Sequence, residues 1–105
     1  MNENRFQRIL KDRLQERFPS AIILKNDANF LQGFPDLLIL YEDTWAALET
    51  KKSEKASIRP NQAYYVEELD KMSYSRFVNP DNIEEILDEL QQVFKYGKPS
   101  RLFRG

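Results

Sequence analysis

The chain has 105 residues, 41% of them apolar and 31% charged, with a formal net charge of −1 and with no histidine or cysteine. This composition predicts one small globular domain over residues 1–105 rather than a disordered chain. The missing histidine and cysteine exclude disulfides, thiolate sites and Ser-His or Cys-His pairs, so catalysis would need carboxylates, lysine, hydroxyl groups or a hard metal ion.

Charge and hydropathy add expectations about location and partners. No apolar run approaches the roughly 18 residues of a membrane span, and no signal-peptide pattern opens the chain, so we expect a cytoplasmic protein without a membrane partner. Basic residues gather in three segments, 5–25, 51–59 and 95–104, the last of which extends into a basic tail over 98–105. This segregation permits a basic face for a polyanion, but ordinary solvated helix faces more often explain such a pattern.

The first half of the chain predicts a helix followed by three strands. Apolar residues recur at helical spacing over residues 2–18, where Pro19 marks the end. Residues 21–24 predict a short buried strand, and a polar loop over 25–33 follows. Residues 37–41 and 45–51 are apolar runs separated by Glu42-Asp43, which predicts a hairpin.

The second half predicts two more helices and one strand. A polar, basic connection over residues 53–60 leads into a helix that starts at Pro60 and ends near residue 71. A short strand is expected within 73–78, and Asn79 is expected to start a last helix, which Gly97 and Pro99 close. The order α-β-β-β-α-β-α implies an α/β fold with a small mixed sheet flanked by helices.

The hairpin carries charge where buried strands rarely do. If the hairpin turns symmetrically about Glu42-Asp43, the residue numbers of each cross-strand pair add up to 85. Asp36 then lies opposite Glu49. Lys51 is two residues beyond Glu49 and points to the same face. Three charged groups therefore converge at one end of an apolar hairpin, provided that no bulge shifts the pairing.

Two facing carboxylates repel, and a divalent hard cation removes that conflict. A neighbouring lysine can orient the attacking water or stabilise growing negative charge, so this set is sufficient to hydrolyse a phosphodiester. The simpler interpretation is an aspartate that ends a loop and an exposed Glu49–Lys51 ion pair at a strand end.

The motif Gly33-x-Pro35-Asp36, followed by Glu49-Thr50-Lys51, resembles the core of the PD-(D/E)XK nuclease superfamily. Within it, the chain is most similar to the small stand-alone nucleases of the VRR-NUC and Holliday-junction-resolvase type, many of them from phages. Glu3-x-x-Phe6-Gln7 resembles the first-helix glutamate of that family, and Gln62 resembles the glutamine that opens its second helix. The resemblance covers nearly the whole chain and implies a restriction-endonuclease-like core, although no clear VRR-like basic triplet follows it.

The resemblance implies roles for individual residues. Asp36 and Glu49 would bind Mg²⁺ or Mn²⁺ together with the Thr50 carbonyl, and Lys51 would hold the nucleophilic water. Glu3 would complete the site from the first helix, with Glu16 as its competitor. Gln62 would contact the scissile strand or orient the site. The implied DNA contacts are Lys52, Lys55, Arg59, Gln62, Arg5 and Arg8.

The resemblance also implies an activity and partners. We expect a metal-dependent DNA endonuclease that is selective for branched or junction DNA and acts as a homodimer. It would act in the host cytoplasm if it is phage-encoded. Two alternatives stay open: a nicking or flap nuclease that works with a helicase or packaging machinery, and a catalytically inactive nucleic-acid-binding module. Cleavage assays on junction, flap, duplex and single-stranded DNA separate them.

Overall fold

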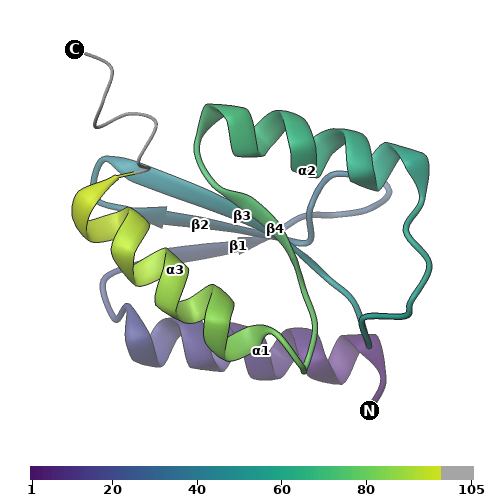
Figure 1. The fold of residues 1–105 in the computed structure, drawn as a ribbon, viewed down its shortest axis with the longest axis horizontal. Coiled ribbons are helices and arrows are strands. Elements are labelled where there is room, and N and C mark those ends of the chain that lie inside the picture. The colour runs from purple at the N-terminus through teal and green to yellow at the C-terminus, as the bar shows by residue number, and fades with distance from the viewer. Residues whose placement is uncertain (98–105) are drawn as a thin grey trace.

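The computed structural model describes residues 1–97, so the basic tail predicted over 98–105 lies outside the described residues. In chain order the elements are α1 (Glu3–Arg17), β1 (Ile22–Lys25), β2 (Leu37–Tyr41), β3 (Thr44–Thr50), α2 (Pro60–Met72), β4 (Ser75–Val78) and α3 (Ile83–Tyr96) (Figure 1). The predicted α/β fold and its element order are confirmed. None of these helices is long and apolar enough to cross a membrane.

The four strands form one mixed sheet in the order β1-β2-β3-β4. The pairs β1–β2 and β2–β3 are antiparallel, whereas β3 and β4 are parallel and are joined through α2, as a parallel pair requires. In the hairpin, Tyr41 pairs with Thr44 and Leu37 pairs with Leu48. The expected symmetric register is therefore confirmed, and β2 and β3 are the central strands.

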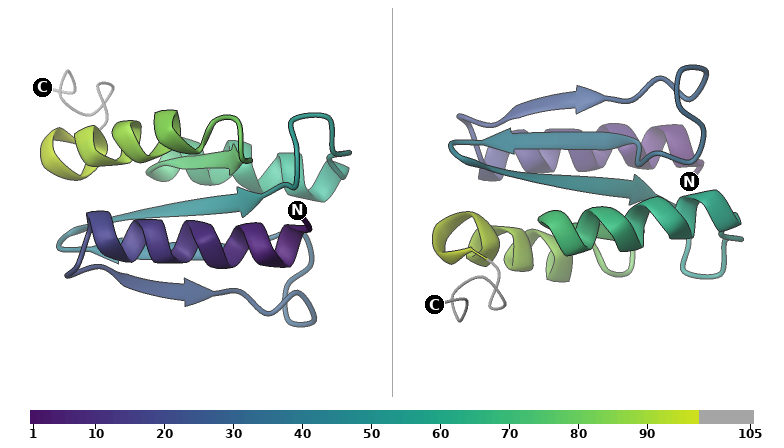
Figure 2. Two further views of the ribbon diagram at one scale, coloured as in Figure 1. Left: turned by 90° about the horizontal axis from the view of Figure 1, so that it is seen from below. Right: turned by 90° about the horizontal axis from the view of Figure 1, so that it is seen from above.

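The hydrophobic core lies between the sheet and the helices α1 and α3. These two helices cover one face of the sheet, and α2 covers part of the other face (Figure 2). The alternate strand residues that face α1 and α3 are fully buried together with leucines of both helices: Leu37, Ile39, Ala46, Leu48, Leu10, Leu14, Leu87 and Leu90. The amphipathic period of α3 predicted this stripe, because residues at helical spacing share one face.

Two local expectations were wrong. Strand β1 is an edge strand, and its side chains Ile22 and Leu24 are 59% and 47% exposed, so it is not a buried strand. The reason is that α2 lies over β3 and β4 and does not reach β1. Helix α3 begins after Asn82 rather than at Asn79, because the Asn79 side chain accepts hydrogen bonds from the backbone N–H groups of Asp81 and Asn82 and so holds a turn.

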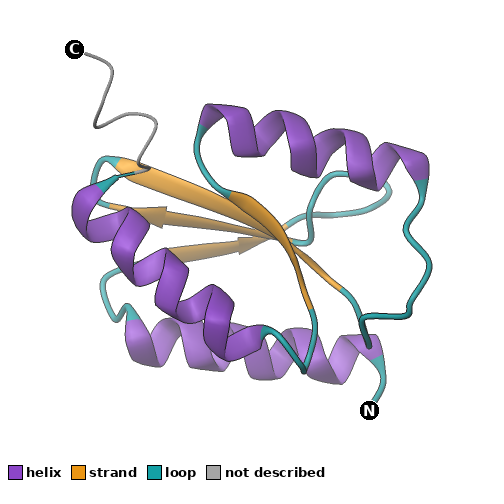
Figure 3. Ribbon diagram, in the orientation of Figure 1, coloured by secondary structure: helices purple, strands orange, loops and turns teal. Residues whose placement is uncertain are grey.

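Three segments that are distant in the sequence meet at one end of the sheet. The loops over residues 26–36 and 51–59 lie on either side of the N-terminus of α1, as the two views of Figure 2 show. Figure 3 shows the same two loops beside the start of α2. The motif residues 33–36 and 49–51 are at this end, so the fold places the candidate site where loops from both faces of the sheet come together.

We expect Leu87→Ala to lower the free energy of unfolding by about 2–5 kcal/mol, because Leu87 is fully buried between α3 and the sheet. The matched control is Leu24→Ala, which removes the same atoms from a half-exposed side chain and should cost less than about 1 kcal/mol. Urea unfolding measures both values. Equal losses would contradict the assignment of the core to the α1–α3 face.

Candidate active site

Asp36 is the residue immediately before β2, and its carboxylate is fixed by Thr50. Asp36 Oδ2 accepts hydrogen bonds from the Thr50 backbone N–H at 2.8 Å and from the Thr50 hydroxyl at 2.6 Å. The Asp36 carbonyl accepts from the Asn26 N–H at 2.8 Å. Both the side chain and the backbone of Asp36 are thereby held at the end of the hairpin, one position beyond the last pair, Leu37–Leu48.

Glu49 is a buried carboxyl group, only 3% exposed, on the sheet face that α2 covers. Its Oε1 accepts a hydrogen bond from Gln62 Nε2 at 3.1 Å, whereas its Oε2 is buried and has no hydrogen-bond partner among the described residues. Burial first, and then the adjacent Asp36 carboxyl, raise the pKa of Glu49 from 4.5 to about 9, although the Lys51 ammonium opposes the shift. Without a cation, Glu49 is therefore protonated at neutral pH.

Lys51 and Gln62 complete a hydrogen-bonded chain that leads to Glu49. Lys51 is 8% exposed, and its Nζ donates to Gln62 Oε1 at 2.7 Å and to the Ser57 carbonyl at 3.0 Å. Gln62 Oε1 also accepts from the Arg59 backbone N–H at 3.0 Å, as in the N-terminal turn of a capped helix. The amide of Gln62 thus bridges the lysine and the glutamate, and the structure brings all four proposed catalytic residues, Asp36, Glu49, Lys51 and Gln62, to one place.

Gln7 has a role at the site that the sequence motifs did not indicate. Gln7 is a buried polar residue of α1, and its Nε2 donates to the Thr50 hydroxyl at 3.4 Å, while that hydroxyl donates to Asp36. Gln7 therefore helps to orient the hydroxyl toward the aspartate. Its signal in the sequence was a glutamine between Phe6 and Leu10 on the buried side of an amphipathic helix, where a polar residue needs a partner.

The Asp36–Glu49 pair fits a hard divalent cation. A Mg²⁺ or Mn²⁺ site typically takes one or two carboxylate ligands from the protein, and its remaining ligands are water or phosphate oxygens. Asp36 and Glu49 supply two carboxylates, and Glu49 Oε2 is buried without a hydrogen-bond donor among the described residues. Within residues 1–97, however, no group of three or more acidic side chains is close enough to form a metal cluster. The site is therefore a two-carboxylate site in the part of the chain that the structure describes.

Glu3 and Glu16, the two candidates for a third carboxylate, lie at opposite ends of α1. Glu3 is exposed in the first turn, lines the same hollow as Lys51 and Gln62, and is near enough to raise the pKa of Glu49. Glu16 is thirteen residues further along, roughly 20 Å at the rise of an α-helix. The geometry favours Glu3 over Glu16, and metal ligation by Glu3 or by the Thr50 carbonyl stays a prediction.

Most of the expected DNA contacts gather beside the predicted catalytic residues. A hollow of about 750 Å³ is lined by Lys51, Lys52, Lys55 and Arg59 together with Glu3 and Gln62. Arg5 and Arg8 do not line it; they are exposed on α1. A smaller hollow of about 190 Å³ on the other side is lined by Asp36, Glu49 and Gln62 and by residues of the loop over 26–34. Arg59 and Gln62 line both hollows, whereas Lys51, Lys52 and Lys55 line only the larger, cationic one.

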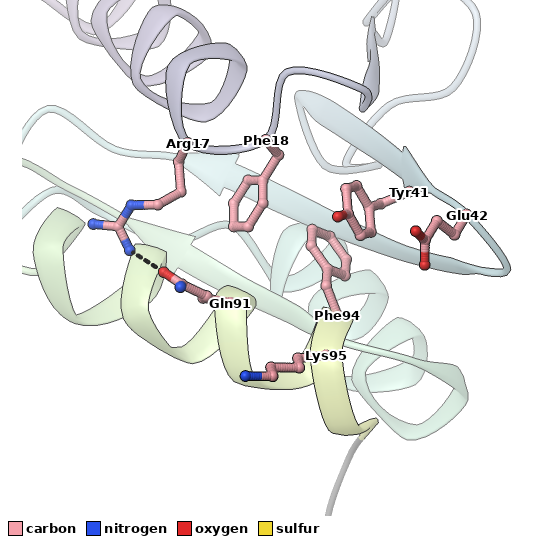
Figure 4. A pocket seen from close by; sticks show the side chains of 7 residues that line it. All are labelled: Arg17, Phe18, Tyr41, Glu42, Gln91, Phe94 and Lys95. Atoms are coloured by element: carbon pink, nitrogen blue, oxygen red, sulfur yellow. Dashed lines mark hydrogen bonds between the residues drawn. The ribbon is translucent and has the colours of Figure 1, made fainter.

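A further hollow, of about 390 Å³, lies at the opposite end of the sheet (Figure 4). It is formed by an aromatic cluster in which the rings of Phe18 and Phe94 meet at 5.1 Å and those of Tyr41 and Phe94 at 5.0 Å. Arg17 closes its rim by donating to Gln91 at 2.9 Å. Strand β2 separates this hollow from Asp36 by roughly 17 Å, so it takes no part in the candidate active site.

Gly33 joins the loop before Asp36 to the start of α2. Its φ of +84° is in the left-handed region, and a Cβ at this position would lie 2.6 Å from Cγ and Nδ2 of Asn61. Only glycine permits this approach. Because Asn61 directly precedes Gln62, the glycine of the motif lets the aspartate loop pack against the turn that supplies Gln62.

No protein-family model and no curated protein matches the chain. Among solved structures, a protein described as a VRR_NUC domain protein superposes with a TM-score of 0.66 at 21% identity, covering 93% of this chain and 92% of the other. A second, described as a VRR_NUC domain, also has a TM-score of 0.66, at 25% identity, with 82% of this chain and 94% of the other covered. The chain therefore has the fold of the VRR_NUC domain proteins, a family of PD-(D/E)XK nucleases.

We expect Glu49→Gln to stabilise the metal-free protein at pH 8 by roughly 1–3 kcal/mol. Because the pKa of Glu49 is raised to about 9, its contribution to stability is fully present below pH 4.5 and is lost as pH rises toward about 9. The variant has no proton to lose in this window, so its stability should change less with pH. Thermal unfolding in EDTA between pH 5 and pH 9 measures this, and parallel pH profiles would contradict it.

We expect Gly33→Ala to destabilise the protein by about 1–3 kcal/mol, since the methyl group adds a contact with Asn61 to the backbone strain. Gly97→Ala is the matched control: its φ is +78°, but nothing lies within 4 Å of the added Cβ. The difference between the two losses in urea unfolding isolates the contact with Asn61. Equal losses would show that the loop does not need to approach α2 this closely.

Proposed function

We propose that this chain is a metal-dependent nuclease domain that hydrolyses phosphodiester bonds in DNA. The observation that carries the proposal is the buried Glu49 Oε2, which has no partner among the described residues although it lies beside Asp36 and within the Lys51–Gln62 chain. An unpartnered buried carboxylate is costly, and a function that supplies a cation accounts for its presence. The VRR_NUC fold supports the same conclusion.

The roles of the residues follow from their contacts. Asp36 and Glu49 would hold Mg²⁺ or Mn²⁺, which when bound polarises a phosphate oxygen and lowers the pKa of water. Asp36 is suited to this because Thr50 occupies only Oδ2 in the described contacts. The Lys51 ammonium lies at the border of the cationic hollow, where it would orient water or stabilise negative charge on the phosphate. Gln62 positions both Lys51 and Glu49.

The cationic hollow would hold the DNA backbone. Lys52, Lys55 and Arg59 are exposed and can each contact a phosphate without reading sequence. Binding should then weaken steeply with salt, since each neutralised phosphate releases counterions. Arg5 and Arg8 on α1 would extend this surface. Selectivity for branched DNA, a homodimer, a helicase or packaging partner and a cytoplasmic location stay predictions of the family resemblance.

We expect Asp36→Asn to lower the rate of DNA cleavage by at least about 100-fold, because it removes a charged metal ligand while keeping the hydrogen-bond acceptor for Thr50. Cleavage of junction, flap, duplex and single-stranded DNA is measured with Mg²⁺, with Mn²⁺ and with EDTA. Thermal unfolding of the same samples should show that the metal ion stabilises the wild type and not the variant.

The matched control is Asp43→Asn, which changes an exposed aspartate in the turn at the far end of the same hairpin and should leave cleavage unchanged. Cleavage without metal, or an Asp36→Asn protein as active as the wild type, would sink the proposal. DNA binding without any cleavage would instead support the inactive nucleic-acid-binding module.

A further inference from the structure

The loop between β1 and β2 displays an exposed aromatic ring. Phe30 is 87% exposed, the largest value among the large apolar side chains of the described residues, and its neighbour Leu31 is 36% exposed. A single exposed apolar residue is common and needs no special explanation. The position and the construction of this loop, however, distinguish Phe30 from the other exposed residues.

Hydrogen bonds within the loop hold Phe30 in place. The Asp27 carbonyl accepts from the backbone N–H groups of Phe30 at 2.9 Å and Leu31 at 3.3 Å, and the Asp27 carboxylate accepts from the Asn29 N–H at 2.9 Å. The Asn26 side chain donates to the Leu31 carbonyl at 3.3 Å. The backbone at Phe30 is therefore held in a hydrogen-bonded turn, so little backbone entropy would be lost when the ring contacts a ligand.

The loop is attached to the candidate active site. The Asn26 N–H donates to the carbonyl of Asp36, and Asn29 and Gln32 line the 190 Å³ hollow that also contains Asp36 and Glu49. A DNA strand that enters this hollow to reach the two carboxylates would therefore lie next to the loop.

Lysine side chains lie on one side of the site only. Lys52 and Lys55 line the larger hollow and are absent from the lining of the smaller one, to which Asn29, Gln32 and Asn61 contribute amide groups; Arg59 lines both hollows. The two loops flank the N-terminus of α1 (Figure 2). Phosphates would be drawn to the cationic side, and the bases of the same strand would face the amides and the aromatic ring.

We propose that Phe30 stacks on an unpaired base next to the scissile phosphate, and that this loop makes the protein select DNA with unpaired bases. Every base offers a π-face to an aromatic ring, but in a duplex both faces are already covered by neighbouring bases. The amide groups of the small hollow supply donors and acceptors for the edge of such a base. The proposal rests on the nuclease function proposed above and names its substrate class.

The test is a binding measurement in EDTA, where metal-dependent cleavage does not interfere. Fluorescence anisotropy gives the Kd for a single strand of roughly 20 nucleotides, longer than common site sizes, and for its fully paired duplex. Phe30→Ala should raise the Kd for the single strand about 5- to 150-fold, corresponding to about 1–3 kcal/mol of stacking, and should change the Kd for the duplex less than about twofold. Phe30→Trp should restore binding to the single strand, and Phe30→Leu should not.

The matched control is Tyr96→Ala, an exposed aromatic residue of α3, 54% exposed and outside both hollows, which should bind like the wild type. Unchanged melting temperatures show that all variants fold. If Phe30→Ala binds the single strand as tightly as the wild type does, the stacking role is overturned and the nuclease proposal is not. The same holds if Phe30→Ala raises the Kd for the single strand and for the duplex equally. A wild-type protein that binds neither DNA overturns this inference, whereas the nuclease proposal is decided separately by the cleavage assay with Mg²⁺ and Mn²⁺.

Discussion

The arrangement of the site depends on one interaction, the binding of the Asp36 carboxylate by the backbone N–H and hydroxyl of Thr50. This contact holds an acidic side chain at the end of a buried hairpin, directly beside Glu49. Two carboxyl groups in such a place conflict unless a proton or a cation lies between them. Because the pKa of Glu49 is raised to about 9, a proton on Glu49 relieves the conflict in the metal-free protein. The buried Glu49 Oε2, which has no hydrogen-bond partner within residues 1–97, marks where a cation would bind.

The neighbouring elements can be understood as the support of this pair. Helix α2 begins with a turn whose Gln62 donates to Glu49 and accepts from Lys51, and helix α1 contributes Gln7, which donates to Thr50. The two helices lie on opposite faces of the sheet, so the pair is held from both sides. Gly33 allows the aspartate loop to approach α2 closely enough for this. A local feature that reduces stability is thus kept by contacts from three segments, as is common where function requires strain.

Much of the fold followed from periodic patterns. The helical period in α1 and α3, and the single turn between two apolar runs, predicted the elements and the pairing of Tyr41 with Thr44, because a tight turn fixes the register of a hairpin. The errors arose where neighbours outside the segment decide. Residues 21–24 read as buried because they are apolar, yet whether a strand is covered depends on how far α2 extends over the sheet. The start of α3 was misplaced because Asn79 and Asn82 are both good N-caps, and the local hydrogen bonds choose between them.

The sequence by itself determined the chemistry that is available: no histidine, no cysteine, and an aspartate, a glutamate and a lysine brought together by counting along one hairpin. These residues are neighbours through backbone pairing, which a local pattern encodes. Only the tertiary structure decided that Gln62 and Gln7 reach them, that Glu3 rather than Glu16 lies near them, and that Lys52 and Lys55 line one hollow while the loop that carries Phe30 lines another. Such contacts join side chains of segments that are distant along the chain, and they depend on how helices and loops pack against the sheet, which no local periodicity specifies.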